Sequence, residues 1–600
     1  MISLLTFAEG AYKYASPVVQ EYIQSTVFTP LGFDVLCTSL FALPPCTTNV
    51  RFVGAGTETL AAQASSAVER LGEYHYIHAQ TLHAWGMPYC ISIIPLTEGI
   101  NTTKEKEEKE REGGVFMDNG NKDLSVVVVV DTGCAEAVLR GSDVFAPGVV
   151  SVNGVCAVGQ RVHIAVDLSH TKIESQKGRE SPIVIVDNNN NNNSDNNNNN
   201  KEGRDGVMLV CVGYGTAVMD RRTMLCKQHK GLAVRNEWTP MTQPSKRLLS
   251  ELLHAVADDA TQTITRGIIS SIEKEEKEKK EECDDDSGIF FLQNYSSMVA
   301  VELLMRQLRA YVISNDKPLA LLDACAAPGG KTSLLLSLLY ETITPKHYYP
   351  LSGNSKESVE SPSLPFTVVC CERSPLRYRR LNELLQRHFG PSFVEAVVRP
   401  FCGDVNKLQQ MQRKRETVGE SSECFFHGIL LDPPCTGMGL RPKLTPHTIT
   451  LQGIRDSADY QRKLIDSCVK MLCRTNTSVL VYSTCSITLD ENESNVLWTL
   501  QKYPFIRLAR ARSEYDRELC SLSATNFGEG RRFLLQDEIR EAQHRNELLC
   551  LENNVCTESD VCEEEPLMVL RFMPRLSTAD EDGVGFFVAV FLCHGDYRIS

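Results

Sequence analysis

The sequence has 22 cysteines, but no two of them are spaced Cys-x-x-Cys, so it lacks the pairs that begin most structural zinc sites. No apolar run reaches the ~18 residues that a membrane-spanning helix needs. The stretch 1–9 has no basic residue before its glutamate, unlike a secretion signal. We therefore expect reduced thiols rather than a disulfide framework, no metal and no membrane partner. The expected compartment is the cytoplasm, with the nucleus as the alternative.

An excess of positive charge is also missing, because the formal net charge is −14. This argues against nucleic acid, which favours basic surfaces. Much of the acid, however, lies in runs such as 284–286 and 563–565. Basic residues cluster elsewhere, at Arg373, Arg377, Arg379 and Arg380, and at Lys227, Lys230 and Arg235. Since local charge matters more than the sum, a nucleic-acid partner stays open.

Four tracts of low complexity divide the chain. They cover residues 104–111, 188–200, 273–286 and 352–365, and their composition predicts disordered insertions in surface loops. A chain of 600 residues is long enough for several domains. We predict an N-terminal α+β segment over 1–112, a small β-rich domain over 124–236, a helical and charged linker over 237–286, and an α/β domain over 287–600.

The first two segments have few clear elements. We expect a strand at 49–53 and a helix at 58–73, then strands at 126–130, 161–166 and 207–212. Gly213-Tyr214-Gly215 is expected to form a turn. A short helix in a small barrel closed by glycine turns fits the order in 124–236.

The third segment alternates strands and helices, which is typical of a doubly wound sheet. The expected strands are 319–322, 367–371, 396–401, 428–431 and 479–482, with a terminal strand at 585–591. The apolar spacing between 376 and 389 predicts a helix.

A glycine-containing stretch, Cys-Ala-Ala-Pro-Gly-Gly-Lys at 325–331, follows the first of these strands and opens a helix. Glycines let a ligand approach the backbone, and a helix N-terminus offers free N–H donors. An NTPase P-loop is the rival interpretation, but it requires glycine where Cys325 stands. S-adenosylmethionine carries no phosphate, so a shorter loop suffices. Glu372 and Asp404, after the next two strands, are candidates for its ribose and adenine.

Two cysteines follow two further strands, Cys435 in Asp-Pro-Pro-Cys and Cys485 in Ser-Thr-Cys-Ser. Carbon 5 of cytosine is a poor nucleophile until a thiolate adds to carbon 6, so methyl transfer to this carbon needs a reactive cysteine. Asp432 is placed to hydrogen-bond the ring edge. These residues alone do not decide which cysteine attacks.

The motifs at 325–331, 432–437 and 483–486 resemble the signatures of the Nop/Sun-type RNA cytosine-5 methyltransferases. Weaker matches occur at 291–294, 461–464 and 585–587, so that the resemblance covers about 287–600. Residues 124–236 resemble a PUA domain, an RNA-binding module, through the stretches 137–141 and 146–148. A PUA domain in this place, and the run 439–442, are similar to the tRNA-modifying branch of the family.

The resemblance implies a Rossmann-like methyltransferase domain joined to the PUA domain, acting on tRNA near its acceptor end. We expect a monomer, since nothing in the sequence suggests an obligate dimer. It implies that Cys485 is the nucleophile and that Cys435 assists release of the RNA, with Asp432 and Lys331 at the base. The expected S-adenosylmethionine site consists of Cys325, Ala326, Ala327, Pro328, Gly329, Gly330, Lys331, Glu372, Asp404 and Asp432.

Two alternatives remain at this point. One is the same chemistry on ribosomal or messenger RNA, and the other is a non-catalytic RNA-binding assembly factor. The presence of both cysteines and of the glycine loop argues against the second. An amino-directed methyltransferase is disfavoured, since it needs an aromatic residue where Cys435 stands.

Overall fold

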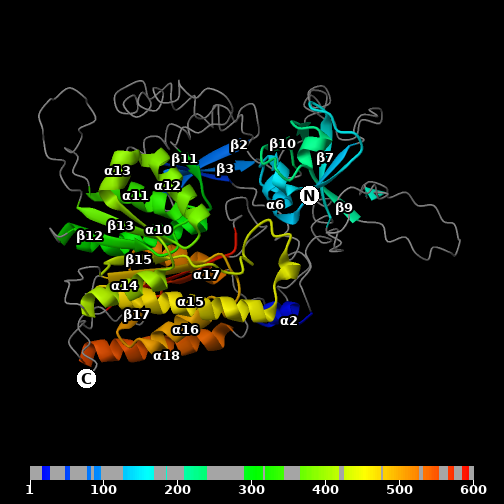
Figure 1. Ribbon diagram of the computed structural model, residues 1–600. Helices are drawn as coiled ribbons and strands as arrows, with labels where there is room; N and C mark the ends of the chain where they lie inside the picture. Colours follow the sequence, from blue (N-terminus) through cyan, green and yellow to red (C-terminus); the bar gives the residue numbers. More distant parts are fainter. Residues whose placement is uncertain are drawn as a thin grey trace, which may run out of the picture.

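The computed structural model describes fifteen stretches of the chain. They are residues 17–26, 48–53, 77–82, 87–95, 126–167, 184–185, 208–239, 290–314, 318–343, 365–417, 425–474, 478–525, 532–552, 565–572 and 584–593. Within them, three β-sheets and their helices are arranged as in Figure 1.

The main sheet has the strand order β14-β13-β12-β15-β16-β19-β17, with β18 beside β19. The strands from β14 to β16 are parallel, and β19 runs antiparallel to β16, β17 and β18. This is the expected Rossmann-like α/β fold class. The strands are β12 (Leu319–Asp323), β13 (Phe366–Glu372), β14 (Val398–Cys402), β15 (Gly428–Leu431), β16 (Ser478–Thr484), β17 (Ile506–Leu508), β18 (Val569–Phe572) and β19 (Phe586–Cys593).

Helices cover both faces of this sheet (Figure 1). One face carries α10 (Tyr295–Ser314), α11 (Gly330–Ile343), α12 (Pro375–Phe389), α13 (Pro391–Val397) and α17 (Glu514–Thr525). The other carries α14 (Val405–Thr417), α15 (Leu451–Met471), α16 (Glu493–Lys502) and α18 (Arg532–Glu552). In the described stretches, no helix is both long and apolar enough to cross a membrane.

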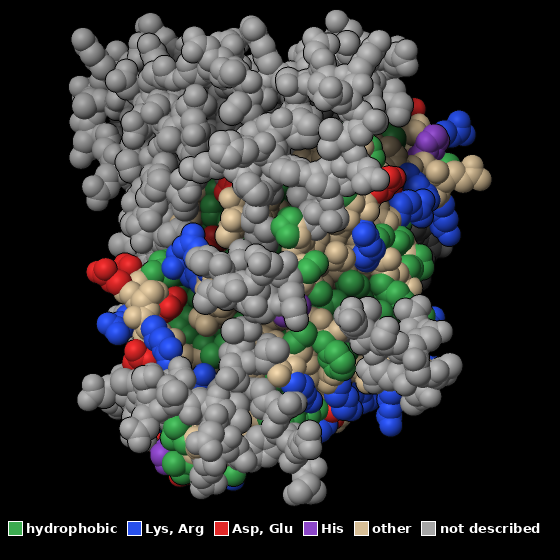
Figure 2. Space-filling model, turned by 90° about the vertical axis from the view of Figure 1, so that its left-hand side faces the viewer, with side chains coloured by type: hydrophobic (Ala, Val, Ile, Leu, Met, Phe, Trp, Pro, Cys, Tyr) green, Lys and Arg blue, Asp and Glu red, His purple; other side chains and the backbone are tan. Residues whose placement is uncertain are grey.

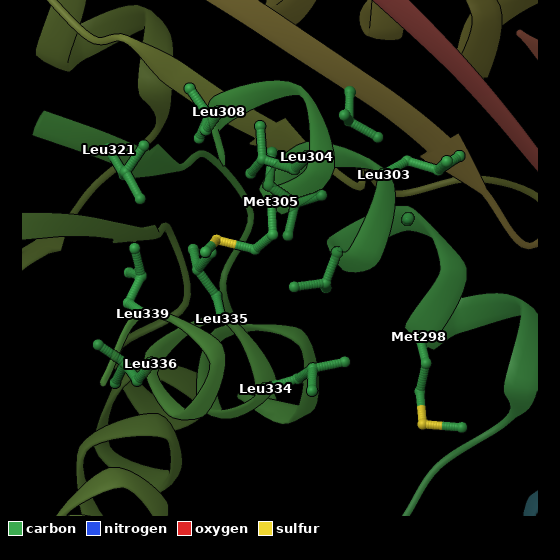
Figure 3. Close-up of a cluster of buried hydrophobic side chains, with 14 of the residues drawn as sticks. Met298, Leu303, Leu304, Met305, Leu308, Leu321, Leu334, Leu335, Leu336 and Leu339 are labelled. Atoms are coloured by element: carbon green, nitrogen blue, oxygen red, sulfur yellow. The ribbon is translucent and has the colours of Figure 1, made fainter. Parts of the chain in front are cut away.

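The apolar core of the first face lies between α10, α11 and β12, as Figure 3 shows. Leu304 and Leu308 of α10 meet Leu335 and Leu339 of α11 around Leu321, and all five side chains are fully buried. Each such leucine contributes about 1.5–3 kcal/mol relative to an exposed one. This packing fixes the start of α11, where the glycine loop ends.

The second sheet has the order β5-β10-β9-β7-β4-β6, with β8 beside β9, and the short helix α6 packs on β7 and β9. Its elements are β4 (Val127–Val130), α6 (Thr132–Leu139), β5 (Val144–Phe145), the 3-10 turn η2 (Ala146–Gly148), β6 (Val149–Asn153), β7 (Arg161–Asp167), β8 (Val184–Ile185), β9 (Met208–Ala217), α7 (Arg221–Met224) and β10 (Leu232–Trp238).

The turn expected at 213–215 is wrong, because these residues lie inside β9 and pair with β7 and β10. A Cβ on Gly215 would lie 2.0 Å from the carbonyl oxygen of Arg235. Glycine is therefore required here by close approach of a neighbouring strand, not by a change of direction.

The third sheet has the order β11-β1-β3-β2 and joins distant parts of the chain. Its strands are β1 (Thr48–Phe52), β2 (Ile77–Leu82), β3 (Met87–Pro95) and β11 (Phe290–Leu292), and β11 pairs antiparallel with β1. The helix α2 (Pro17–Thr26) lies against α15 (Figure 1).

A second sequence expectation also needs correction. The strand expected from residue 396 begins at Val398, because Pro391 opens the helix α13 that runs to Val397. Proline is favoured in the first turn of a helix, and the following strand starts where that helix ends. The helix expected at 58–73 lies outside the described residues. So do the four low-complexity tracts apart from Pro365, and the linker beyond Thr239.

Candidate active site

The carboxyl ends of β12, β15 and β16 meet at one edge of the main sheet. Leu431 pairs with Tyr482, so the next residues, Asp432 and Ser483, are neighbours. Ser483 Oγ donates to Asp432 Oδ1 at 2.9 Å, and Lys331 Nζ donates to Asp432 Oδ2 at 2.7 Å. The carboxylate is therefore held in one orientation by two elements. It keeps a partly exposed face toward a pocket.

Cys435 and Cys485 face each other across this edge. Their sulfur atoms are 3.1 Å apart, although the residues come from two separate strand ends. The hydrogen bond to Cys485, together with burial, raises the pKa of the Cys435 thiol well above its ordinary value. Cys435 therefore keeps its proton at neutral pH.

A buried carboxylate, Glu491, fastens the two cysteine loops together. Its oxygens accept from Thr436 N at 2.9 Å and Thr436 Oγ1 at 2.6 Å, next to Cys435. They also accept from Ser486 Oγ at 2.5 Å, next to Cys485, and from Thr488 Oγ1 at 2.7 Å. Gln461 Nε2 is a further donor at 3.1 Å. A carboxylate with this many donors stabilises one relative position of the loops.

Both sulfurs open into a pocket of about 340 Å³ at the same edge. Glu372 and Asp404, at the ends of β13 and β14, lie in its wall. Ser374 N donates to Glu372 at 2.8 Å, and Arg377 lies 3.6 Å from that carboxylate. Tyr460 Oη donates to Asp404 Oδ2 at 2.5 Å. Two acids with fixed orientation thus stand in a concave site that the two thiols share.

The glycine loop forms another side of this pocket, and its backbone leaves no room for larger residues. Gly329 has φ +115°, and a Cβ on Gly330 would lie 2.8 Å from the ring of Phe291. Behind the loop, Arg51 Nη2 donates to Gly330 O at 3.3 Å, and Arg51 is fully buried. The N-terminal sheet therefore supports the loop from the side away from the pocket.

The loop is also tied to the end of β12. Thr332 Oγ1 donates to Asp323 Oδ2 at 2.8 Å, and burial raises the pKa of Asp323 to about 6. Burial also raises the pKa of Cys325 well above the ordinary thiol value, so Cys325 is a neutral wall residue.

The expected cofactor residues are brought together, but not all face the pocket. Its lining includes Cys325, Ala327, Pro328, Glu372, Asp404 and Asp432. Ala326, Gly329, Gly330 and Lys331 belong to the same loop without lining the pocket, and Lys331 reaches the site through Asp432. Carboxylates for hydroxyl and amine groups, and a glycine cradle at a helix start, fit S-adenosylmethionine.

Sequence reasoning missed three residues of the site and named Arg377 only as part of a basic cluster. Glu491 holds the cysteine loops, Tyr460 holds Asp404, and Arg377 and Lys443 add positive charge to the pocket wall. Tyr460 immediately precedes the motif at 461–464, which was the available signal. The sequence contains no comparable signal for Glu491, because its hydrogen-bond partners lie on three different segments.

Comparison with known proteins agrees with this geometry. Residues 366–589 match the family described as 16S rRNA methyltransferase RsmB/F, and residues 126–169 match the PUA domain. The human tRNA (cytosine(72)-C(5))-methyltransferase NSUN6 is 25% identical over 470 residues, which is 77% of this chain and 75% of the relative. The rRNA (cytosine-C(5))-methyltransferase NOP2C of Arabidopsis thaliana is 25% identical over 450 residues, or 66% of each chain.

A solved structure, NSun6 from Pyrococcus horikoshii with SFG, matches 93% of each chain with a TM-score of 0.48 and 20% identity. The family match covers the motifs at 432–437 and 483–486, and the PUA match covers the stretches 137–141 and 146–148. The chain therefore carries an RsmB/F-type methyltransferase domain and a PUA domain, and it matches the PUA-bearing branch of the Nop/Sun-type RNA cytosine-5 methyltransferases, which transfer a methyl group from S-adenosylmethionine to carbon 5 of cytosine in RNA.

Proposed function

We propose that this enzyme methylates a cytosine of tRNA near the acceptor end, with Cys485 as the nucleophile and Cys435 as the residue that assists release. The observation that carries the proposal is the pair of sulfurs 3.1 Å apart at the rim of the pocket that holds Glu372 and Asp404. A nucleophile, its partner thiol and the expected cofactor wall share one cavity.

The division of labour between the cysteines is supported by the state of Cys435. The hydrogen bond to Cys485 and burial raise the pKa of the Cys435 thiol, so Cys435 stays a protonated, poor nucleophile, and the attack is assigned to the sulfur of Cys485. Its attack on carbon 6 of the cytosine forms a C–S bond and moves electron density to carbon 5. S-adenosylmethionine supplies the methyl group that carbon 5 accepts.

We assign Asp432, which lines the pocket, to the polar edge of the ring, with Lys331 acting through it. Their 2.7 Å ion pair is close to the two thiols and is anchored by Ser483, so it offers a donor and an acceptor in fixed positions. Such preorganised groups stabilise the charge that develops as the thiolate adds. Release then requires that a base removes the proton from carbon 5. The C–H electrons re-form the ring double bond as the C–S bond to Cys485 breaks.

The tRNA substrate is supported by the relatives and by the domain composition. The human and Pyrococcus horikoshii relatives are named as tRNA (cytosine(72)-C(5))-methyltransferases, and the chain carries a PUA domain beside the catalytic domain. Figure 2 shows Lys and Arg side chains in several separate groups on one face, so local basic surface exists despite the net charge of −14.

A second candidate substrate is ribosomal RNA. It is favoured by the 16S rRNA methyltransferase description of the matching family and by the name of the Arabidopsis relative. Cytoplasmic localisation and a monomeric state stay predictions from the sequence.

The test is bisulfite sequencing of total RNA after incubation of the protein with S-adenosylmethionine. We expect a new 5-methylcytosine near the 3′ end of tRNA that is absent with Cys485→Ala. Cys435→Ala should instead accumulate a covalent protein–RNA adduct, visible on a denaturing gel. A methylated cytosine only in ribosomal RNA would replace the tRNA proposal with the second candidate. Adducts that persist with Cys485→Ala would reverse the roles of the cysteines.

A further inference from the structure

The helix α6 of the PUA domain contacts the catalytic domain directly. Leu444 N donates to Glu136 Oε1 at 2.6 Å. Arg140 donates from Nε to Arg441 O at 3.4 Å and from Nη2 to Pro442 O at 3.1 Å. Glu136 and Arg140, one helical turn apart, also form an ion pair at 3.8 Å. Two charged side chains on one face of a short helix thus satisfy three backbone groups of a buried catalytic segment.

Residues 437–444, the segment that Glu136 and Arg140 contact, also contact the backbone of Cys485. Gly439 N donates to Cys485 O at 2.9 Å, and Gly439 O accepts from Gly585 N at 2.7 Å. The approach is close, since a Cβ on Gly439 would lie 2.1 Å from Gly585 O and 2.9 Å from Cys485 O. Leu440 and Lys443 of this segment line the pocket. The PUA contact and the cysteine backbone are therefore linked through fewer than ten residues.

The two domains also share one apolar cluster. Ala135, Val138 and Leu139 of α6 belong to the same buried group as Met438 and Leu444 of segment 437–444. Ile487, two residues after Cys485, is a further member. Buried apolar packing resists displacement, so a shift of α6 relative to the segment would disturb this cluster.

We propose that Glu136 and Arg140 are positioning residues for methyl transfer, which set the backbone of Cys485 through segment 437–444. The RNA-binding domain thereby contributes to the rate of the chemical step as well as to RNA affinity. This inference rests on the proposed role of Cys485. A displacement of about 1 Å at a reacting group is enough to lower a rate by about 100-fold, so loss of the one bond of Glu136 or the two of Arg140 should have a measurable effect.

The first test needs no RNA. Hydrogen–deuterium exchange is measured on the full chain for the wild type, Glu136→Ala, Arg140→Ala and Glu136→Gln. We expect exchange at 437–444, including Gly439, to accelerate about tenfold or more in both alanine variants. Glu136→Gln keeps an acceptor oxygen for Leu444 N and should stay within about twofold of the wild type. Acceleration confined to Leu444, with Gly439 unchanged, would overturn the inference.

The second test separates rate from affinity. Single-turnover methylation at saturating RNA and S-adenosylmethionine should fall about tenfold or more in the alanine variants, while the Kd for RNA stays within about threefold. Arg161→Ala is the matched control, because Arg161 pairs with Glu237 inside the PUA domain, 3.7 Å away, and should leave the rate unchanged. Arg140→Lys keeps one donor and should give an intermediate rate, which checks the result if Arg140→Ala fails to fold.

A raised Kd with an unchanged rate would show that α6 serves RNA binding alone and would overturn the inference. If the wild type methylates no tRNA, the proposed substrate fails. The inference is then decided by exchange and by the rate of Cys485 alkylation with iodoacetamide. That rate should change at least threefold in the alanine variants and not in Arg161→Ala. An unchanged alkylation rate would refute the link to Cys485.

Discussion

Glu491 offers the most decisive perturbation of the site. In Glu491→Ala, five hydrogen bonds to one carboxylate are lost. The three hydroxyl donors can rebond among themselves, since Ser486 Oγ lies 3.1 Å from Thr436 Oγ1 and 3.2 Å from Thr488 Oγ1. Thr436 N loses its acceptor, and Gln461 Nε2 loses the acceptor of one N–H while the other still donates to Pro434 O at 3.1 Å.

The expected cost can be worked from these two N–H groups. An unsatisfied buried donor costs about 1–3 kcal/mol, so Glu491→Ala should lower the free energy of unfolding by about 2–6 kcal/mol. The cysteine loops also lose their common anchor, so single-turnover methylation should fall at least about 100-fold at a temperature where the variant is folded.

The assay combines denaturant unfolding with single-turnover methylation at 15 °C. Glu538→Ala is the control, because Glu538 is exposed on α18 and should change stability by less than about 0.5 kcal/mol. If Glu491→Ala has the stability of the control and methylates at the wild-type rate, the carboxylate does not hold the two loops and the reasoning is refuted.

Three further predictions concern the cofactor loop and the base site. Asp323 has a raised pKa in the folded protein, so its ionisation destabilises the fold. The free energy of unfolding is therefore highest at low pH and falls as the pH rises from 3.8 to about 6. Asp323→Asn cannot ionise, so its free energy of unfolding, measured with denaturant, should rise by roughly 3 kcal/mol relative to the wild type between pH 4 and pH 7. A difference between the two proteins that does not change with pH would contradict this. Gly330→Ala should weaken S-adenosylmethionine binding, measured by calorimetry, because the added Cβ would clash with the ring of Phe291. Adding Phe291→Leu should restore binding. If it does not, the clash is not the cause of the weaker binding. Asp432→Asn, which weakens the pair with Lys331, should lower the single-turnover rate about 100-fold at saturating S-adenosylmethionine, and an unchanged rate would remove Asp432 from the base site.

The sequence was sufficient to locate the strand ends that carry Cys435 and Cys485. Buried parallel strands are nearly continuous apolar runs, and the residues after them meet at one edge of the sheet whatever the loops do. The same local reasoning failed at Gly213 and Gly215. There a neighbouring strand, β10, decides the conformation, and no pattern within residues 207–217 reports the approach of Arg235.

Contacts between distant segments were beyond prediction for a similar reason. The role of Glu491 depends on Thr436, Gln461 and Ser486 meeting in space. The contact of Glu136 with Leu444 joins residues 308 positions apart. Charged side chains at such positions look like ordinary surface residues in the sequence. Only the packing of the two domains shows that they are donors and acceptors for a buried segment.

The pairing of β11 with β1 has a consequence for how the protein is made. Arg51 of β1 and its partner Gln293, which follows β11, are 242 residues apart in the sequence, and the second sheet is encoded between them. At translation rates of about 5–20 residues per second, β1 is synthesised about 12–50 s before its partner strand. Its edge is unpaired on that side for this time, while the PUA domain has ample time to fold. The nascent chain therefore completes its RNA-binding module before the support behind the cofactor loop exists. Slow synthesis through the intervening region prolongs the exposure of that strand edge to chaperones.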